Sequence, residues 1–498
     1  MTEVDITIVQ VPRIAPVRPS SAPAVLKAMC NSVSKSSKVL DFNREFYLEY
    51  TKTNPEVARQ IDEYWIAMTT TLTDEAKIFY QDLIQQWVKK ILEVKSKIVA
   101  ICVFSWQSHR FVRDFLETLR PQYNGEILIG GQGLSLHQHM SSHQTPATYA
   151  EELLSNGLID WYLKGETEET FPRFMQGERD LPGLNNDFNT QPDINLTPYG
   201  DYTNVDITSY QNGFEGGVLP LETSRGCIRN CAFCDQSSPY GVLRHKDGVS
   251  IANELLFYYK TYNVKNFYFH DYVINANLTE LHKFLDVLLD YYKENGLPDR
   301  YFTFSGYWII RPQKEFAEAE FEKLYRAGAN TLVTGVETGS DKLRTKMRKG
   351  FLNRDLEFNI NQINHYRLKF YFMLIAGLPG ETLDDFQQTL DMLTRWQKYV
   401  ASGSIIGVNL GTTTTIEPGT HIHKHAKKFK IVGLKGNEPE GINWLSLETP
   451  ELDYKERARR RIVMQEHVMN LGYPMWKGDD HLKIMVDVYR ANIEMWEG

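Results

Sequence analysis

Residues 221–236 read LETSRGCIRNCAFCDQ, and they place Cys227, Cys231 and Cys234 at the spacing C-x3-C-x2-C. The cysteines come directly after an apolar segment of strand length, so one loop carries all three thiols. Three thiolates on one loop can converge on a single metal centre, and thiolates are the usual protein ligands of iron–sulfur clusters. They satisfy three irons of a cubane and leave the fourth open to an exchangeable chelating molecule. The spacing therefore predicts a [4Fe–4S] cluster that acts as a reagent and not as an electron carrier alone.

Zinc is the alternative metal for such a loop. A structural zinc site needs four ligands, usually supplied as two separated pairs. The chain has five cysteines, no second cysteine pair near the loop, and only His245 as a nearby fourth ligand. Cys30 and Cys102 are most simply small buried hydrophobic residues. Zinc and a purely structural cysteine cluster remain the alternatives to the iron–sulfur interpretation.

Six segments of strand length, separated by helical patterns, begin at this loop and continue toward the C-terminus. They are GVLPLETS, NFYFHD, YFTFSGYWII, NTLVTGVE, FYFMLIAGL and SIIGVNLGT. Six successive β/α units predict an α/β domain over residues 216–424, folded as a partial β/α barrel with its catalytic groups where the strands end. The pattern then becomes helical and polar, so residues 425–498 are predicted to form a small helical C-terminal cap.

The first third of the chain also alternates between short strands and helices. Its strand candidates are DITIVQV, KVLDF, KIVAICVF, EILIGG and DWYLKG, which predict a doubly wound parallel sheet with ligands at the carboxyl ends of its strands. This domain is expected over residues 1–175, with a helical insertion at residues 54–95. Residues 176–215 carry many turn-forming Pro, Gly and Asn residues and are predicted to be a linker.

Composition limits the possible partners of the chain. Its 498 residues carry a formal net charge of -8, which gives no overall attraction to nucleic acid or to anionic membranes. The basic run of Arg344, Lys346, Arg348 and Lys349 could hold a phosphate, but is interpreted as a solvated helix face. There is no signal-peptide pattern and no run of about 20 apolar residues. An odd number of cysteines, three of them clustered, indicates a reducing compartment, and the protein is expected in the cytoplasm.

The cysteine loop, with the aromatic Phe233 before its last cysteine and six β/α units around it, resembles the radical S-adenosylmethionine (SAM) superfamily. The resemblance covers about residues 216–421. It implies that SAM chelates the open iron and that one electron from the cluster cleaves SAM to methionine and a 5′-deoxyadenosyl radical. It also implies an external one-electron donor, such as a flavodoxin or a ferredoxin.

The same resemblance suggests further SAM contacts beside Phe233, at the ends of the strands. Glu337 in VTGVETGS would hydrogen-bond the SAM ribose, although a carboxylate there could instead cap the next helix. Gly377 and Gly380 in IAGLPGET would lie beside the adenine, although a tight turn would use the same residues. Asp271 in NFYFHDY would reach the SAM amino group, with helix N-capping as the alternative.

The N-terminal segments KIVAICVF, EILIGGQG and IDWYLKGETEETFPRF resemble the cobalamin-binding subclass of the superfamily. In that subclass the glycines after the fourth strand lie against cobalamin, and the GE-x-E segment starts the last helix. The positions that carry over are Gly130, Gly131, Gly133, Gly165, Glu166 and Glu168. The alternative is a degenerate scaffold without cobalamin.

The motif Asp-x-His-x-x-Gly, which supplies a histidine ligand to cobalt in other cobalamin proteins, is absent from the sequence. The resemblance therefore implies cobalamin without a protein histidine on cobalt. His137, His139 and His143 are expected on an exposed loop.

Together these features predict a radical SAM enzyme, most simply a cobalamin-dependent methyltransferase that acts on an unactivated carbon. A cobalamin-independent radical rearrangement, ring closure or oxidation is the first alternative. A non-catalytic iron–sulfur module that binds or senses redox state is the second. The acidic chain, rich in Tyr and Phe, favours a small metabolite, a lipid or a peptide over RNA as substrate.

Overall fold

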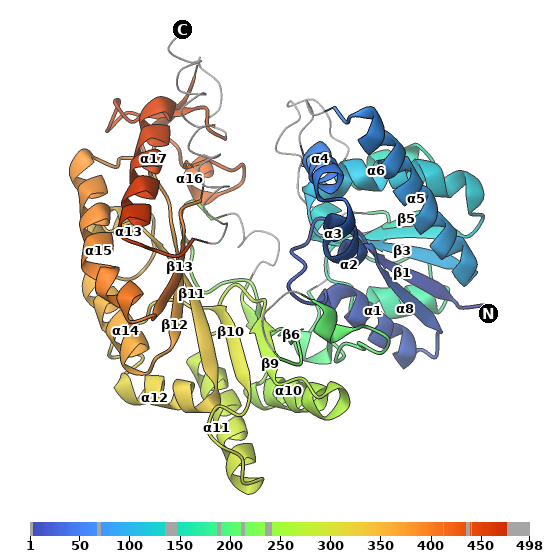
Figure 1. The fold of residues 1–498 in the computed structure, drawn as a ribbon, viewed down its shortest axis with the longest axis horizontal. Coiled ribbons are helices and arrows are strands. Elements are labelled where there is room, and N and C mark those ends of the chain that lie inside the picture. Colours follow the sequence, from blue (N-terminus) through green and yellow to red (C-terminus); the bar gives the residue numbers. More distant parts are fainter. Residues whose placement is uncertain are drawn as a thin grey trace. The chain divides into compact units, whose positions relative to one another are not determined.

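The computed structural model describes residues 3–66, 71–134, 148–186, 191–210, 215–234, 242–411, 413–434, 439 and 441–475. The chain divides into two compact units. Unit 1 comprises Met1–Pro220 and Tyr258–Asn266, and unit 2 comprises Leu221–Phe257 and Phe267–Gly498. Figure 1 shows one sheet in each unit. No helix among the described residues is long and apolar enough to cross a membrane.

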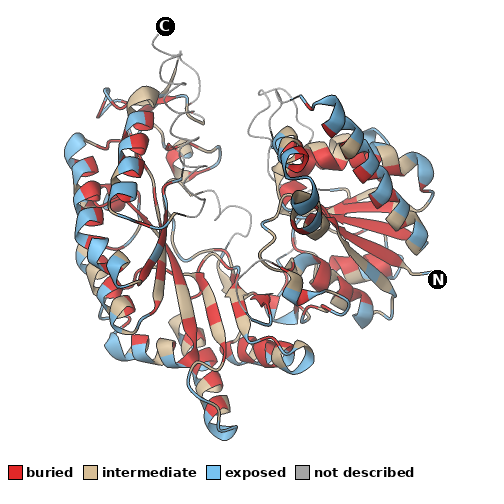
Figure 2. Cartoon of the chain, viewed as in Figure 1, coloured by how far each residue is buried: buried red, intermediate tan, exposed pale blue. Residues whose placement is uncertain are grey.

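Unit 1 contains a five-stranded sheet in the order β2-β1-β3-β4-β5, and all its strands are parallel. The strands are β1 Ile6–Gln10, β2 Ser37–Asp41, β3 Ile98–Cys102, β4 Glu126–Gly130 and β5 Trp161–Leu163. Successive side chains of β1 and β3 enter two separate apolar cores. Ile8 and Ala100 belong to one core, and Val9 and Ile101 to the other. A strand buried on both faces needs a continuous apolar run, and β1 and β3 are buried along their whole length (Figure 2). The parallel sheet with both faces covered confirms the predicted doubly wound fold.

Helices cover both faces of this sheet (Figure 1). They are α1 Ser21–Ser32, α2 Phe42–Glu45, α3 Thr51–Thr53, α4 Pro55–Ile66, α5 Asp74–Val94, α6 His109–Leu119, α7 Tyr149–Ser155 and α8 Thr170–Met175. Two of them, α4 and α5, fall in the segment 54–95. Aromatic packing fixes them to the unit, since Trp87 of α5 stacks on Phe42 with ring centroids 4.7 Å apart.

Unit 2 contains a six-stranded sheet in the order β13-β12-β11-β10-β9-β6. The strands are β6 Val218–Leu221, β9 Asn266–Phe269, β10 Thr303–Tyr307, β11 Ala329–Glu337, β12 Lys369–Leu374 and β13 Ile405–Asn409. The pairs from β10 to β13 are parallel. Each predicted strand segment contains one of these strands to within one residue, and the order of the strands follows the chain. This is the arrangement expected for six β/α units.

The helices of unit 2 come between its strands and after the last one. They are α10 Gly248–Tyr262, α11 Leu278–Glu294, α12 Glu318–Ala327, α13 Asp341–Lys346, α14 Asn353–His365, α15 Leu383–Ala401, α16 His421–Lys424 and α17 Tyr454–Asn470. The C-terminal part also contains an antiparallel ribbon that the sequence did not indicate. It pairs β14 Ile431–Gly433 with β15 Trp444–Ser446.

Candidate functional site

The cysteine loop begins where a small antiparallel ribbon ends. Ser224–Arg225 (β7) pairs with Arg244–His245 (β8), and Gly226 follows with φ +84°, a backbone conformation that favours glycine. Buried Ala232 lies between the second and third cysteines. Its N–H donates to the Met347 carbonyl at 2.9 Å, and its own carbonyl accepts from the Ile422 N–H at 2.8 Å. Backbone from two distant segments therefore holds the loop.

Cys227, Cys231 and Cys234 form no disulfide, and all three are partly exposed. The Arg229 N–H donates to Cys227 Sγ at 3.3 Å. Burial raises the pKa of the Cys231 thiol, whereas the nearby Lys349 ammonium lowers it. Within the described part of the chain, no three His, Cys, Asp or Glu side chains stand in metal-binding geometry. The fit to an iron–sulfur cluster therefore rests on the donor set: three unbridged thiols on one anchored loop, with a cation nearby.

His245, the candidate fourth ligand of a zinc site, contacts the start of α11 through one ring nitrogen. Its Nε2 lies 2.6 Å from the Nδ2 atom of Asn277, the residue that caps α11. The ring is thus engaged in holding β8 against the start of that helix. The three cysteines without a fourth ligand remain the pattern that motivates the iron–sulfur prediction.

Glu337 ends β11 in a strained conformation. Its φ is +65°, and the Thr338 N–H donates to the Val336 carbonyl at 2.9 Å, which closes a three-residue turn around Glu337. A positive φ is unfavourable for a residue with a side chain, and it persists only where surrounding contacts impose it. The turn folds the carboxylate back over Gly335. A Cβ atom at Gly335 would overlap Glu337 Oε1 and would lie 3.0 Å from Lys349 Nζ.

The partner of the Glu337 carboxylate is Lys349, which the sequence analysis missed as a site residue. Lys349 Nζ lies 3.0 Å from Glu337 Oε1, and the two side chains are only 12% and 8% exposed. The same ammonium lies 5.7 Å from the ring centroid of Phe233. Burial lowers the pKa of Lys349, but Glu337 and the thiols of Cys231 and Cys234 raise it, and the net shift is upward. The structure thus brings the cysteine loop, Phe233 and Glu337 together around one buried cation.

The interpretation of the run 344–349 as a solvated helix face is wrong for two of its residues. Arg344 is fully buried, and its Nε donates to the Thr338 carbonyl at 2.9 Å. After α13, Arg348 adopts φ +61° and the Lys349 N–H donates to the Arg344 carbonyl at 2.9 Å. This C-terminal cap turns Lys349 inward. The spacing of the charges along the sequence could not reveal this burial. The groups that Arg344 and Lys349 contact, the Thr338 carbonyl and the Glu337 carboxylate, belong to the segment at the end of β11.

The helix-capping alternatives for two predicted SAM contacts are wrong. Ser340 caps α13, and its side chain accepts from the Leu343 N–H at 3.3 Å, so Glu337 does not cap that helix. Asn277 caps α11, so Asp271 does not. Both carboxylates are therefore free of a capping role.

Asp271 instead holds the strand that leads into the cysteine loop. Its carboxylate accepts from the backbone N–H groups of Thr223, at 2.8 Å, and Ser224, at 3.1 Å, and from the Thr223 hydroxyl. Burial and the neighbouring Glu222 raise the pKa of Asp271 to about 7. Its role as a contact of the SAM amino group stays a prediction, and its observed contacts position the loop.

A buried ion-pair network lies beside Asp271 and was not foreseen. Glu222 pairs with Arg225 at 2.9 Å, and Lys246 pairs with Glu254 at 3.0 Å. Burial is the largest single influence and opposes ionisation of Glu222, but Arg225, His270 and Lys246 together outweigh it and lower the pKa of Glu222 to about 2. These charges lie directly before the cysteines and after β8, so they stiffen both ends of the loop.

Gly377 and Gly380 have φ values of +76° and +82°, as a tight turn after β12 requires. A Cβ atom at Gly377 would lie 2.5 Å from Cγ of Arg457, and one at Gly380 would overlap Nζ of Lys346. Side chains of this protein therefore fill the space that the missing Cβ atoms leave. The contact of Gly377 and Gly380 with the adenine stays a prediction.

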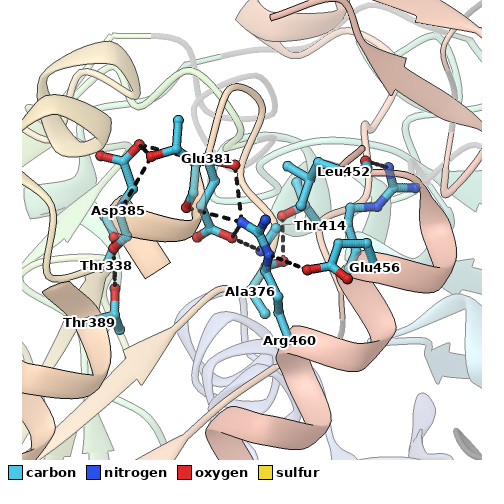
Figure 3. Close-up of polar contacts among 12 residues, drawn as sticks. Thr338, Ala376, Glu381, Asp385, Thr389, Thr414, Leu452, Glu456 and Arg460 are labelled. Atoms are coloured by element: carbon cyan, nitrogen blue, oxygen red, sulfur yellow. Dashed lines mark hydrogen bonds and ion pairs between the residues drawn. The ribbon is translucent and has the colours of Figure 1, made fainter. Parts of the chain in front are cut away.

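The turn after β12 is tied to α17 by Arg460 (Figure 3). Arg460 Nη1 donates to the carbonyl and to Oε2 of Glu381, both at 3.0 Å, and Glu381 Oε2 also accepts from the Gly377 N–H at 3.0 Å. Arg460 and Glu381 are 2% and 1% exposed. Arg460 Nε also donates a hydrogen bond to Glu456 Oε1 at 3.0 Å. This arginine joins segments about 80 residues apart, and no local pattern pointed to it.

In unit 1, the predicted cobalamin residues follow neighbouring strands β4 and β5. Gly131 has φ +117°, and a Cβ there would overlap the Val103 carbonyl oxygen. A Cβ at Gly133 would lie 2.9 Å from the Ser105 nitrogen, whereas Gly130 has room for one. The glycines therefore allow the segment after β4 to approach the segment after β3. Their contact with cobalamin stays a prediction.

The GE-x-E segment comes directly after β5. Gly165 has φ +80°, Glu166 is buried, and Glu168 Oε1 accepts from the Thr197 hydroxyl at 3.1 Å. The segment precedes α8, which begins at Thr170, so the expectation that it starts the helix was placed a few residues early. Because β4 and β5 are adjacent and parallel, both predicted cobalamin segments lie at the carboxyl edge of one sheet. The candidate histidines His137, His139 and His143 lie outside the described residues.

A comparison with protein families gives a match for part of the chain. The family model of the radical SAM superfamily matches residues 221–393. This stretch begins at the end of β6 and ends within α15, so it includes the three cysteines, Glu337 and the turn after β12.

Solved structures resemble nearly the whole chain. The radical SAM methyltransferase TsrM from Kitasatospora setae, solved with cobalamin and a [4Fe–4S] cluster, superimposes with a TM-score of 0.61 at 14% identity. The match covers 92% of this chain and 85% of TsrM. The cobalamin-dependent enzyme OxsB, solved with aqua-cobalamin and SAM, gives a TM-score of 0.63 at 15% identity over 94% of this chain and 67% of OxsB. The likeness at this identity establishes the fold of both units.

Sequence relatives are distant. An uncharacterized methyltransferase of Pyrococcus horikoshii is 22% identical over an alignment of 329 positions, which covers 59% of this chain and 67% of that protein. Cytidylyl-2-hydroxyethylphosphonate methyltransferase of Streptomyces wedmorensis is 26% identical over an alignment of 251 positions, which covers 46% of this chain and 45% of that protein. The matches therefore span about two thirds of the length of the first relative and less than half of the second. The cysteine loop and the six-stranded sheet agree with this family match, in which residues 221–393 are similar to the radical SAM superfamily.

Proposed function

We propose that this protein is a radical SAM enzyme that uses cobalamin to transfer a methyl group to an unactivated carbon. Cys227, Cys231 and Cys234 would hold a [4Fe–4S] cluster, which supplies one electron to SAM, while cobalamin supplies the methyl carrier. The observation that carries the proposal is the anchored loop of three cysteines outside any disulfide, beside the largely buried pair of Glu337 and Lys349.

The residues around the loop would orient SAM without reacting. Glu337 stands at the carboxyl end of the central strand β11, with its carboxylate already fixed by Lys349. A fixed acceptor loses less entropy when a ribose hydroxyl binds to it than a mobile side chain would. Asp271 would hold the start of the loop through Thr223 and Ser224, and Phe233 would form an apolar wall.

Unit 1 supports the cobalamin part of the proposal by its topology. The two glycine-containing segments after β4 and β5 share one sheet edge, which is where doubly wound sheets bind ligands. The nearby His109 is held inside the protein: its Nε2 lies 2.9 Å from the Gly133 carbonyl and its ring stacks on Tyr149 at 3.7 Å. Burial lowers the pKa of His109 to about 4. We therefore expect no axial imidazole from His109.

The compartment and the substrate belong to the proposal as well. Five free thiols support a reducing compartment such as the cytoplasm. The substrate would be a small metabolite, a lipid or a peptide, and a flavodoxin or ferredoxin would supply the electron.

Labelled SAM tests the function directly. With deuteromethyl SAM under anaerobic reducing conditions, the product should gain an intact CD3 group. S-adenosylhomocysteine and 5′-deoxyadenosine should form in about equal amounts, since one SAM would methylate cobalamin and a second would be cleaved. An unlabelled product with 5′-deoxyadenosine alone would favour the rearrangement or oxidation alternative. If a protein with a reduced cluster forms neither co-product, the result would support the non-catalytic alternative.

A further inference from the structure

A strongly basic segment follows β13 in the same unit. Residues 421–430 read HIHKHAKKFK, so seven of ten residues are His or Lys. Its first four residues form α16. The side chains of Lys424, His425, Lys427, Lys428 and Lys430 are exposed. We call residues 421–430 the basic segment.

The basic segment is built directly onto the cysteine loop. The Ile422 N–H donates to the Ala232 carbonyl at 2.8 Å, and Ala232 lies between Cys231 and Cys234. Beneath the charges, Ile422 and Phe429 share one buried apolar cluster with Ala232. The exposed cations therefore lie on a segment whose backbone is hydrogen-bonded to the cysteine loop, and the buried apolar cluster holds that segment in place.

The arrangement concentrates positive charge, and among the described residues little of it is paired. Within the described residues, Lys424, Lys427 and Lys428 form no ion pair, and Lys430 pairs with Glu448 at 3.2 Å as an exposed side chain. Burial and the neighbouring cations, including Arg348, Lys424 and Lys428, lower the pKa of His421. Like charges held together repel, and exposed charges add little stability. The chain as a whole carries a net charge of -8, so the local positive charge of the basic segment is opposite in sign to the net charge of the chain.

We infer that the basic segment is the docking surface for an acidic one-electron donor protein. The inference rests on the proposed function, in which the cluster must be reduced. One electron leaves the reduced donor and enters the oxidised cluster, so the donor is oxidised by one electron and the cluster is reduced by one. A donor must approach the cluster closely, and opposite charges at the contact raise the rate of encounter. The basic segment provides both the position and the charge.

Nucleic acid is the other partner that a basic surface could bind. The observations favour the donor, because the segment is short, is attached to the cysteine loop and belongs to an acidic chain. RNA-binding surfaces combine phosphate contacts with aromatic stacking platforms. The basic segment exposes no Phe, Tyr or Trp side chain, since Phe429 is buried.

Charge reversal tests this surface. The variant Lys424→Glu, Lys427→Glu, Lys428→Glu should bind reduced flavodoxin at least tenfold more weakly at low salt, measured by biolayer interferometry on the cluster-loaded protein. Stopped-flow reduction of its cluster by flavodoxin should slow by a similar factor, and the difference should shrink at high ionic strength. Reduction by dithionite, a small chemical reductant, should proceed normally.

A matched control changes the same charge elsewhere. Lys260, Lys293 and Lys398 each lie in the last turn of a helix that leads into the amino end of a strand, away from the cysteine loop. The variant Lys260→Glu, Lys293→Glu, Lys398→Glu should bind and accept electrons from flavodoxin as the parent does. Iron content and melting temperature establish that both variants are folded and loaded.

The outcomes separate the docking surface from the proposed function. Unchanged flavodoxin affinity and reduction rate in the basic-segment variant would overturn the docking surface. Equal losses in both triple variants would also overturn it, because the effect would then follow net charge alone. Loss of binding to a single-stranded RNA probe with normal flavodoxin reduction would assign the segment to nucleic acid. A parent protein without iron, or whose cluster dithionite cannot reduce, would contradict the proposed function instead.

Discussion

Glu337 and Gly335 illustrate how single residues shape the candidate site. The carboxylate of Glu337 occupies the space where a Cβ atom of residue 335 would lie. The pair with Lys349 therefore depends on a glycine that takes no part in the pair itself. A strained residue held by such contacts is typical of a functional site.

The Gly335→Ala variant should displace the Glu337 carboxylate while leaving both charges in the chain. We expect SAM affinity to fall roughly tenfold, because a hydrogen bond to a charged group contributes about 1.5–3 kcal/mol. Iron content should not change, since no cysteine is touched. Isothermal titration of SAM into the cluster-loaded protein measures the effect, with Glu337→Ala as the reference for complete loss. Full affinity in Gly335→Ala alongside loss in Glu337→Ala would show that the observed pair geometry is unimportant for binding.

The buried pair also predicts a stability effect. Glu337→Ala leaves the Lys349 ammonium buried without its partner, which should destabilise unit 2 by about 3–5 kcal/mol. The double variant Glu337→Ala, Lys349→Met should recover part of this loss, since it buries no charge. Anaerobic denaturant unfolding of the four proteins in the cycle gives the coupling energy. Strictly additive effects would mean that the two side chains do not pair in solution.

At the scale of elements, α17 acts as a brace for the turn after β12. Arg460 reaches from the middle of that helix to Glu381 and Thr382. Its neighbour Arg457 is also buried and lies over the Trp444 ring at 3.9 Å. The C-terminal helix thus contributes buried cations to the edge of the sheet where SAM is expected.

Arg460→Met should destabilise unit 2 by about 3–5 kcal/mol, because it strands the buried Glu381 carboxylate. Arg459 offers a matched control on the same helix: its side chain is exposed and pairs with Glu456 at 2.8 Å. Arg459→Met should change stability by no more than about 0.5 kcal/mol. Thermal unfolding followed by circular dichroism distinguishes the two. Similar melting temperatures for both variants would show that Arg460 does not stabilise the turn after β12.

At the scale of the whole molecule, buried carboxylates set the pH dependence of stability. Burial raises the pKa of both Asp271 and Glu381 to about 7, above the value of about 4 in an unfolded chain. Between these values the folded state binds more protons than the unfolded state. The stability from each group is therefore full below pH about 4 and is lost as pH rises through 7.

We accordingly expect the melting temperature to decline between pH 5 and pH 8 and to decline less steeply in Asp271→Asn. Glu222 acts in the opposite sense. Its lowered pKa of about 2 contributes stability that is present above pH about 4 and is lost as pH falls through 2. Anaerobic thermal unfolding from pH 2 to pH 8 measures both effects. An unchanged slope in Asp271→Asn would indicate that Asp271 is ionised throughout.

Local patterns were sufficient for the parts of this protein that depend on near neighbours in the chain. Apolar segments of strand length separated by helical periodicity predicted both sheets. In unit 1 the strands β1 and β3 are mostly apolar along their length because both of their faces are buried. The spacing of Cys227, Cys231 and Cys234 predicted a single ligand loop, since residues so close in sequence must share one turn. Positive φ at Gly131 and Gly377 agrees with the turns that their Gly-rich surroundings indicated.

Only the tertiary structure decided which charges meet. Lys349 belongs to a basic run that resembles a solvated helix face, yet a reversed turn at Arg348 directs it to Glu337. Asp271 resembles a helix cap, yet it holds Thr223, 48 residues earlier in the chain. A charged side chain is buried only when another segment brings its partner. The sequence by itself therefore determined the sheets and the thiol loop, and the packing of distant segments determined the electrostatics around that loop.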